Sequence, residues 1–368
     1  MKLLIQPGAG VEPLVDAINK AKNRIEIVVF RFDRSEIEKA LAKAVSRGVF
    51  VHALIAYTNR GGERNLRKLE MRLLASGVTV ARTADDLARY HSKFMIVDRR
   101  ELYLLAFNFT YLDMEHSRSF GLVSRNARLV QEAARLFEAD TKRQPYCPGL
   151  ANFVVSPLNS RTQLSAFIKG ARRELLIYDP EVSDGAMIQL LEERAAAGVS
   201  IRIVGRLTRT SARLQVHKLP QRLHARAIIR DGRSAFIGSQ SLRELELGAR
   251  REVGIIFRDP KVVSRLTKTF EEDWQTEEGS PKQEPHQPAE PAAEVARKVA
   301  KAVAKDLTPI TPVIEVIVKE VVGNNVDVDL DRSGVEASVK DAVKEAVKEV
   351  VRDVVESVVE QNGVEHAR

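Results

Sequence analysis

The chain has 368 residues and a formal net charge of +8 at pH 7, with residues 275–368 holding 12 Lys and Arg against 19 Asp and Glu and residues 1–274 holding 46 against 31. Such a basic N-terminal region predicts an anionic partner, such as an acidic phospholipid or a nucleic acid. The single cysteine, Cys147, excludes an intramolecular disulfide, and no apolar run reaches the roughly 18 residues of a membrane-spanning helix.

The first 145 residues alternate strand and helix patterns. Near-continuous apolar runs predict buried strands, and apolar residues three and four apart predict amphipathic helices. This βαβ rhythm predicts a parallel sheet. In chain order we expect strands at 2–5, 24–30, 49–56, 78–81, 91–97, 102–107 and 120–123, with helices at 11–22, 35–46, 63–74 and 127–137.

Residues 146–274 repeat this plan. The strand, helix and strand expected at 173–178, 186–197 and 199–204 have counterparts in the first half, and a helix at 262–274 closes the repeat. The spacing from Gly48 to His91 is 43 residues, whereas that from Gly198 to His224 is 26. The second half therefore lacks a segment of about one helix, and the chain reads as a duplication.

The composition changes after residue 274. Residues 275–291 are rich in Pro, Glu and Gln, which predicts a linker. In residues 292–368 valines recur every fourth position between charged residues, which predicts helix. We expect this helical tail either to self-associate or to fold as a cap onto the preceding domain.

One pattern occurs twice, once in each half. His91-Ser92-Lys93 is followed by Asp98, and His224-Ala225-Arg226 is followed by Asp231 at the same spacing. Alternating polar and apolar residues predict that 91–97 is a half-buried strand, and each aspartate precedes a hairpin turn. A neutral imidazole next to a fixed cation suits nucleophilic attack at phosphorus.

This pair of motifs resembles the phospholipase D superfamily. The likeness extends to Asn108, ten positions after Asp98, and to Gly238-Ser239; Ser241 replaces the second Asn. A family carboxylate falls at Glu252, whereas the equivalent place in the first half is Ser119. The resemblance implies an α/β fold of two α-β-α halves about a pseudo-twofold, one bilobal domain in which both histidines meet in one cleft.

The resemblance also implies roles for individual residues. Asp98 and Asp231 would be structural, and no metal or other cofactor is expected, because no cluster of His, Cys, Asp or Glu has metal-ligand spacing. The implied catalytic residues are His91, Lys93, His224 and Glu252, and the implied phosphate-binding residues are Lys93, Asn108, Arg226, Ser239 and Ser241.

A catalytic imidazole needs a partner on its second nitrogen. If the halves exchange partners, Glu252 would serve His91 as the nucleophile, and His224, the acid, would have only the Ser119 hydroxyl. If each half supplies its own partner, Glu252 would serve His224. We expect the exchange.

Three functions are compatible with these residues. The first is a phospholipase D-type phosphodiesterase that hydrolyses or transfers phospholipid through a phosphohistidine, without metal. The second is an endonuclease of the same family, and the third is a non-catalytic protein that binds phosphate or nucleic acid. Since the apolar start is too short for a signal peptide, we expect a cytoplasmic protein, with peripheral contact to the inner membrane face left open.

Overall fold

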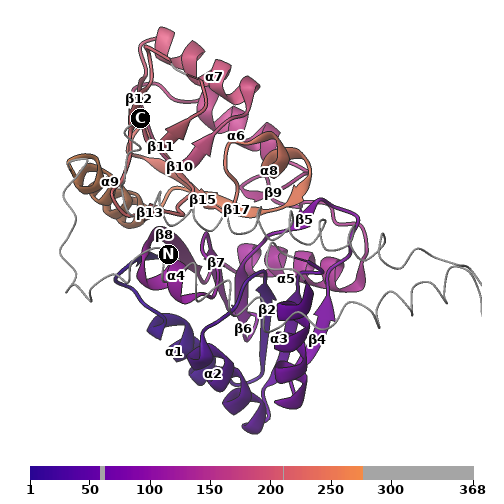
Figure 1. The fold of residues 1–368 in the computed structure, drawn as a ribbon. Coiled ribbons are helices and arrows are strands. Elements are labelled where there is room, and N and C mark those ends of the chain that lie inside the picture. Colours follow the sequence, from indigo (N-terminus) through magenta and orange to yellow (C-terminus); the bar gives the residue numbers. More distant parts are fainter. Residues whose placement is uncertain (59–62, 210, 277–368) are drawn as a thin grey trace, which may run out of the picture. The chain divides into compact units, whose positions relative to one another are not determined.

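The computed structural model describes residues 1–58, 63–209 and 211–276 of the chain. Met1–Pro281 forms one compact unit (Figure 1). The predicted tail (292–368) and almost all of the predicted linker (275–291) lie outside the described residues, so both expectations stay predictions. The predicted boundary between the two halves, at residues 145 and 146, also stays a prediction.

The first half is built on a mixed sheet. Its strands are joined in the order β1-β8-β7-β6-β2-β3-β4, and one short strand of the second half, β13 (Arg222–Leu223), pairs with β8. The pairs β2–β3 and β3–β4 are parallel, and the remaining pairs along that order are antiparallel. The strand bounds are β1 (Lys2–Gln6), β2 (Arg24–Val29), β3 (Phe50–Ile55), β4 (Thr79–Arg82), β6 (Phe94–Val97), β7 (Glu101–Leu105) and β8 (Ser117–Ser124).

The second half repeats this sheet strand for strand. Its order β9-β17-β15-β14-β10-β11-β12 places each strand where its counterpart stands in the first sheet. The shared order confirms the predicted α/β fold of two related halves. The strand bounds are β9 (Phe153–Val155), β10 (Glu174–Val182), β11 (Ser200–Leu207), β12 (Gln215–His217), β14 (Ala227–Arg230), β15 (Ser234–Gly238) and β17 (Val253–Phe257).

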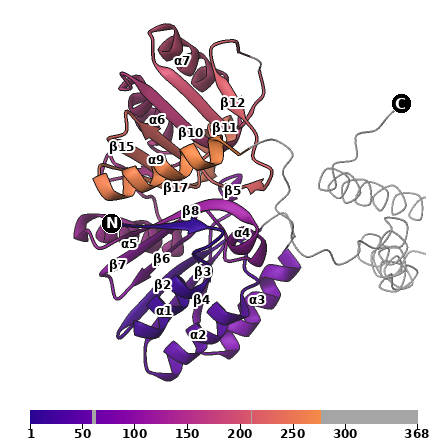
Figure 2. The ribbon, with the colours of Figure 1, turned by 90° about the vertical axis from the view of Figure 1, so that its left-hand side faces the viewer.

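The helices form layers around and between the two sheets (Figure 2). Helices α1 (Glu12–Lys20), α2 (Ser35–Ser46) and α3 (Glu63–Ala75) cover the outer face of the first sheet, and α6 (Ser160–Lys169) and α7 (Gly185–Ala196) cover that of the second. Helices α5 (Ala127–Lys142) and α9 (Pro260–Trp274) join the inner faces of both sheets in one apolar core. Two five-residue helices, α4 (Tyr111–Glu115) and α8 (Glu244–Gly248), complete the halves.

Two sequence expectations need correction. The predicted parallel sheet is in fact mixed. Along its strand order β2, β3 and β4 pair in parallel, whereas β6, β7, β8 and β1 are joined by antiparallel pairs. The predicted half-buried strand at 91–97 begins only at Phe94, and all four residues of β6 are buried. The alternation is real, but both faces are covered: Met95 and Val97 join the outer core, whereas Phe94 and Ile96 join the core between the sheets.

Within the described part of the chain, no helix combines the length and the apolar character needed to cross a bilayer.

Candidate active site

The backbone of each half sets the position of the other half's histidine. His91 follows β5 (Arg89–Tyr90), which pairs in parallel with β16 (Arg250–Arg251), and its backbone N–H donates to Arg251 O at 2.8 Å. His224 follows β13, which pairs in parallel with the start of β8, and its N–H donates to Arg118 O at 2.9 Å. The two histidines are therefore fixed in equivalent ways.

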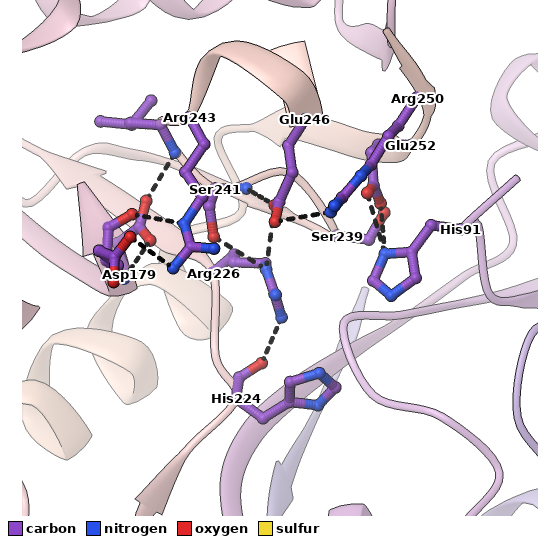
Figure 3. Close-up of polar contacts among 12 residues, drawn as sticks. His91, Asp179, His224, Arg226, Ser239, Ser241, Arg243, Glu246, Arg250 and Glu252 are labelled. Carbon is purple, nitrogen blue, oxygen red and sulfur yellow. Dashed lines mark hydrogen bonds and ion pairs between the residues drawn. The ribbon is translucent and has the colours of Figure 1, made fainter. Parts of the chain in front are cut away.

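His91 contacts a carboxylate from the opposite half. Its Nδ1 lies 2.9 Å from both Oε1 and Oε2 of Glu252, a residue with no exposed surface (Figure 3). The ring also packs edge-on against Phe30, with centroids 4.4 Å apart. With Nδ1 bound to the carboxylate, Nε2 is the nitrogen that can attack. This is the arrangement in which the halves exchange partners.

Lys93 lies against the same imidazole. Its Nζ is 2.9 Å from Nδ1 and 2.8 Å from Nε2 of His91. The Lys93 ammonium is therefore within hydrogen-bond distance of both ring nitrogens. The side chain is 1% exposed, and burial lowers the pKa of Lys93 to about 7.

His224 also contacts a carboxylate from the opposite half, but not the expected neighbour. Its Nδ1 lies 3.1 Å from Oδ2 of Asp113, in ion-pair range although not in hydrogen-bond geometry. Ser119 instead donates its hydroxyl to the backbone O of His224 at 3.3 Å. The expectation that Ser119 alone would serve the imidazole is wrong, because α4 places the Asp113 carboxylate at Nδ1 of the ring.

Asp113 is the functional candidate that the sequence analysis missed. Its Oδ2 accepts hydrogen bonds from the backbone N (2.8 Å) and Nδ2 (2.7 Å) of Asn108, and its Oδ1 accepts one from Arg222 Nη1 at 2.6 Å. A signal was present: Asp113 stands five residues after Asn108, as Glu246 stands five residues after Ser241. A carboxylate thus repeats at this offset in both halves.

The second-half motif residues are held by protein groups. Arg226 donates from Nε to Ser241 Oγ at 3.1 Å and from Nη1 to His224 O at 3.1 Å. Ser239 Oγ accepts from Val253 N at 3.1 Å, and its hydrogen bond to Glu252 acts to lower the pKa of that carboxyl. Arg226 therefore contacts the backbone of His224, whereas Ser239 supports the carboxylate that binds His91.

Asp98 and Asp231 stand apart from this cluster. Each accepts hydrogen bonds from three consecutive backbone N–H groups at the start of a central strand: Lys22, Asn23 and Arg24 for Asp98, and Arg172, Arg173 and Glu174 for Asp231. Both have positive φ, 52° and 55°. These contacts are structural.

Burial and the local charges favour neutral histidines in the free protein. Burial lowers the pKa of His91 well below its usual value, and the charges of Lys93 and Arg226 lower it further. Burial lowers the pKa of His224 to about 4, although Asp113 opposes this. Burial raises the pKa of the Glu252 carboxyl against the influence of Lys93.

The arrangement can perform nucleophilic and acid–base chemistry on an anion. It places two imidazoles, each with a carboxylate at Nδ1, beside two cations that can neutralise phosphoryl oxygens. In the described part of the chain no group of three or more His, Cys, Asp or Glu could hold a metal ion.

Comparison with known proteins identifies relatives of this fold. A family model described as cardiolipin synthase, PLD-like domain, matches residues 14–141 and 164–274. No curated protein matches the chain.

Several solved structures are similar. Polyphosphate kinase from Porphyromonas gingivalis is 19% identical with a TM-score of 0.63 over 83% of this chain, which spans 55% of the kinase, about half its length. Phosphatidylserine synthase from Haemophilus influenzae Rd KW20 is 11% identical with a TM-score of 0.56, over 82% of this chain and 93% of that one. Nuc from Salmonella typhimurium, a phospholipase D family member, is 25% identical with a TM-score of 0.35, over 39% of this chain and 93% of that one.

Proposed function

Since the chain belongs to the phospholipase D superfamily, in the family of cardiolipin synthase PLD-like domains, we propose that it hydrolyses or transfers the phosphodiester of a phospholipid through a phosphohistidine. One observation carries the proposal: His91 and His224 each contact a carboxylate supplied by the opposite half. Such a reciprocal pair fits a two-step displacement at phosphorus, because one imidazole can attack while the other manages the proton.

In the first step Nε2 of His91 attacks phosphorus and the bond to the leaving alcohol breaks. Protonated His224 gives its proton to that alcohol oxygen. Lys93 and Arg226 neutralise the phosphoryl oxygens, and Glu252 stabilises the positive charge that develops on His91.

In the second step the phosphohistidine is resolved. Neutral His224 removes a proton from water or from an acceptor alcohol, whose oxygen attacks phosphorus and releases His91. Water gives hydrolysis and an alcohol gives transfer. Because the pKa of His224 is about 4 in the free protein, we expect the bound phosphate to promote its protonation by adding negative charge near Asp113.

The basic region of residues 1–274 favours a second candidate, a nuclease of the same chemistry. An assay separates the candidates: purified protein with chelator, tested on bis(p-nitrophenyl) phosphate, phosphatidylglycerol liposomes, and single- and double-stranded DNA. Turnover of liposomes alone supports the proposal, and cleavage of DNA alone supports the nuclease. No turnover on any of them, with phosphate still bound, supports the non-catalytic protein.

The central variant is His91→Asn. We expect it to abolish turnover and the acid-labile phosphoenzyme that an alkaline quench traps from the wild type, because Asn cannot form a phosphoramidate. His217→Asn, on β12 at the edge of the second sheet, is the matched control and should retain both. A phosphoenzyme that persists in His91→Asn would move the nucleophile elsewhere, with His224 the first candidate.

A further inference from the structure

The cation of the second half is held differently from that of the first. Arg226 is 7% exposed, and its Nε and Nη1 are bound to Ser241 Oγ and His224 O (Figure 3). Nη2 has no hydrogen-bond partner among the described residues. Lys93, its counterpart, contacts both ring nitrogens of His91. One half therefore presents a fixed guanidinium and the other a lysine whose charge can titrate.

A comparison of the two halves shows which contacts hold the Arg226 guanidinium. In the first half Oδ2 of Asp113 accepts from both the backbone N and the side-chain Nδ2 of Asn108. In the second half Oε2 of Glu246 accepts from the backbone N of Ser241 at 2.7 Å, but the serine has no amide to supply the second donor. Arg226 Nε lies 3.7 Å from that same Oε2.

Glu246 itself is well fixed. It is 2% exposed, and its Oε1 accepts from Arg250 Nη1 at 3.1 Å. A buried carboxylate in this position stabilises a buried guanidinium, which could not give up its charge. The positive charge of Arg226 acts on the other titratable groups of the site and helps to lower the pKa values of His91, Lys93 and His224.

We propose that Ser241 and Glu246 are positioning residues that hold Arg226 as a fixed anchor for a phosphate oxygen, and that Arg226 and Ser241 are one coupled change. The shorter serine leaves the room and the hydrogen-bond acceptor that the guanidinium uses. An asparagine at 241 would bind Glu246 as Asn108 binds Asp113, and would displace Arg226. The proposal rests on the proposed function only for the identity of the anion, because phosphate binding can be measured without turnover.

The test is a double-mutant cycle read by titration calorimetry with inorganic phosphate. We expect Arg226→Lys and Ser241→Asn each to weaken phosphate binding about 10-fold or more, the size of one hydrogen bond to a charged group. The double variant should bind no more weakly than Arg226→Lys alone, since it rebuilds the first-half arrangement of lysine and asparagine. Arg233→Lys, an exposed change on the turn between β14 and β15, is the control and should bind as the wild type does.

Several outcomes would overturn the inference: no phosphate binding by the wild type, an unchanged affinity in Ser241→Asn, or losses that simply add in the double variant. Thermal unfolding of each variant checks that the fold is kept. If Ser241→Asn does not fold, Glu246→Gln decides, because it should weaken phosphate binding at least several-fold and an unchanged affinity would reject the anchor. Wild-type protein that binds phosphate but turns over no phosphodiester would reject the proposed function and leave this test intact.

Discussion

Asp113 serves His224 from the opposite half, as Glu252 serves His91, but from a different place in the chain. Glu252 lies 28 residues after its motif histidine, whereas Asp113 lies 22 after His91. The position equivalent to Glu252 is Ser119, whose hydroxyl holds only the backbone of His224. A buried carboxylate 3.1 Å from Nδ1 favours the imidazolium form that an acid needs.

Replacement of Asp113 by Asn should therefore impair proton transfer. The amide keeps the shape and can still accept from Asn108, but the charge that raises the pKa of His224 is lost. We expect kcat to fall about 10- to 100-fold, and the alkaline limb of its pH profile to move to lower pH. Asp16→Asn, an exposed change with 67% of the side chain accessible, is the control. A lower kcat with an unmoved pH profile would assign Asp113 a purely structural role.

Lys93 predicts a second pH effect. Burial lowers its pKa to about 7, so in the free protein the ammonium is present below that pH and is lost as the pH rises through it. Because the charged form binds phosphate, kcat/KM should fall above about pH 7, approaching tenfold per pH unit. Lys93→Arg should have a lower kcat/KM and should lose this break near pH 7, since guanidinium keeps its proton, so that any decline that remains reports the protonation of His224. A wild-type profile that stays flat to pH 9 would contradict this assignment.

Among the elements, the long periodic ones were predictable and the short ones were not. The helix expected at 35–46 is α2, Ser35–Ser46, because three turns of amphipathic spacing give a clear signal. Helices α4 and α8 have five residues each, too few for any periodicity. They carry Asp113 and Glu246, which explains why the sequence led to Glu252 but not to the carboxylate of His224. The prediction of a half-buried strand at 91–97 was wrong because alternation of polar and apolar residues shows that side chains point to two faces. It does not show whether either face is exposed to solvent.

The hairpin aspartates make a prediction about these elements. Asp98 and Asp231 each tie a turn to the start of the central strand beside it, β2 or β10. Asp98→Ala or Asp231→Ala should lower the free energy of unfolding by about 2–4 kcal/mol, through unpaired N–H groups and strain at positive φ. Thermal or urea unfolding measures this loss.

Below the melting transition the alanine variants should retain wild-type kcat, because neither carboxylate reaches the histidines. The asparagine variants are the controls and should lose less stability, since Asn keeps an acceptor and tolerates positive φ. A fall in kcat without a fall in stability would place these aspartates in the chemistry.

At the scale of the whole molecule, the duplication was visible in the sequence, but the contacts between its copies were not. Repeated patterns predicted two halves, and the missing segment of the second half corresponds to α3. Which residues meet across the halves depends on β5–β16 and β13–β8, pairs of two residues each that leave no periodic signal. The exchange of carboxylates could be posed from the sequence as one of two alternatives; the structure selects it.

The compact unit Met1–Pro281 predicts that the tail is dispensable for the fold. A chain that ends at residue 281 should keep the melting temperature and turnover of the full chain, because both histidines and both carboxylates remain. Light scattering on the full chain and on the shortened chain tests the tail's predicted self-association. If the tail self-associates, the full chain should have the mass of an oligomer and the shortened chain that of a monomer. A shortened chain that is unfolded would instead make the tail part of the domain.

The reciprocal contacts of His91 with Glu252 and of His224 with Asp113 carry an evolutionary consequence. Neither contact can form inside one half, so an ancestor with a single half would have needed a second copy of itself to build the same centre. Any mutation in that ancestor would have altered both copies together. Fusion of two such halves into one chain would remove this constraint, and the two copies could then differ, as Lys93 and Arg226 do.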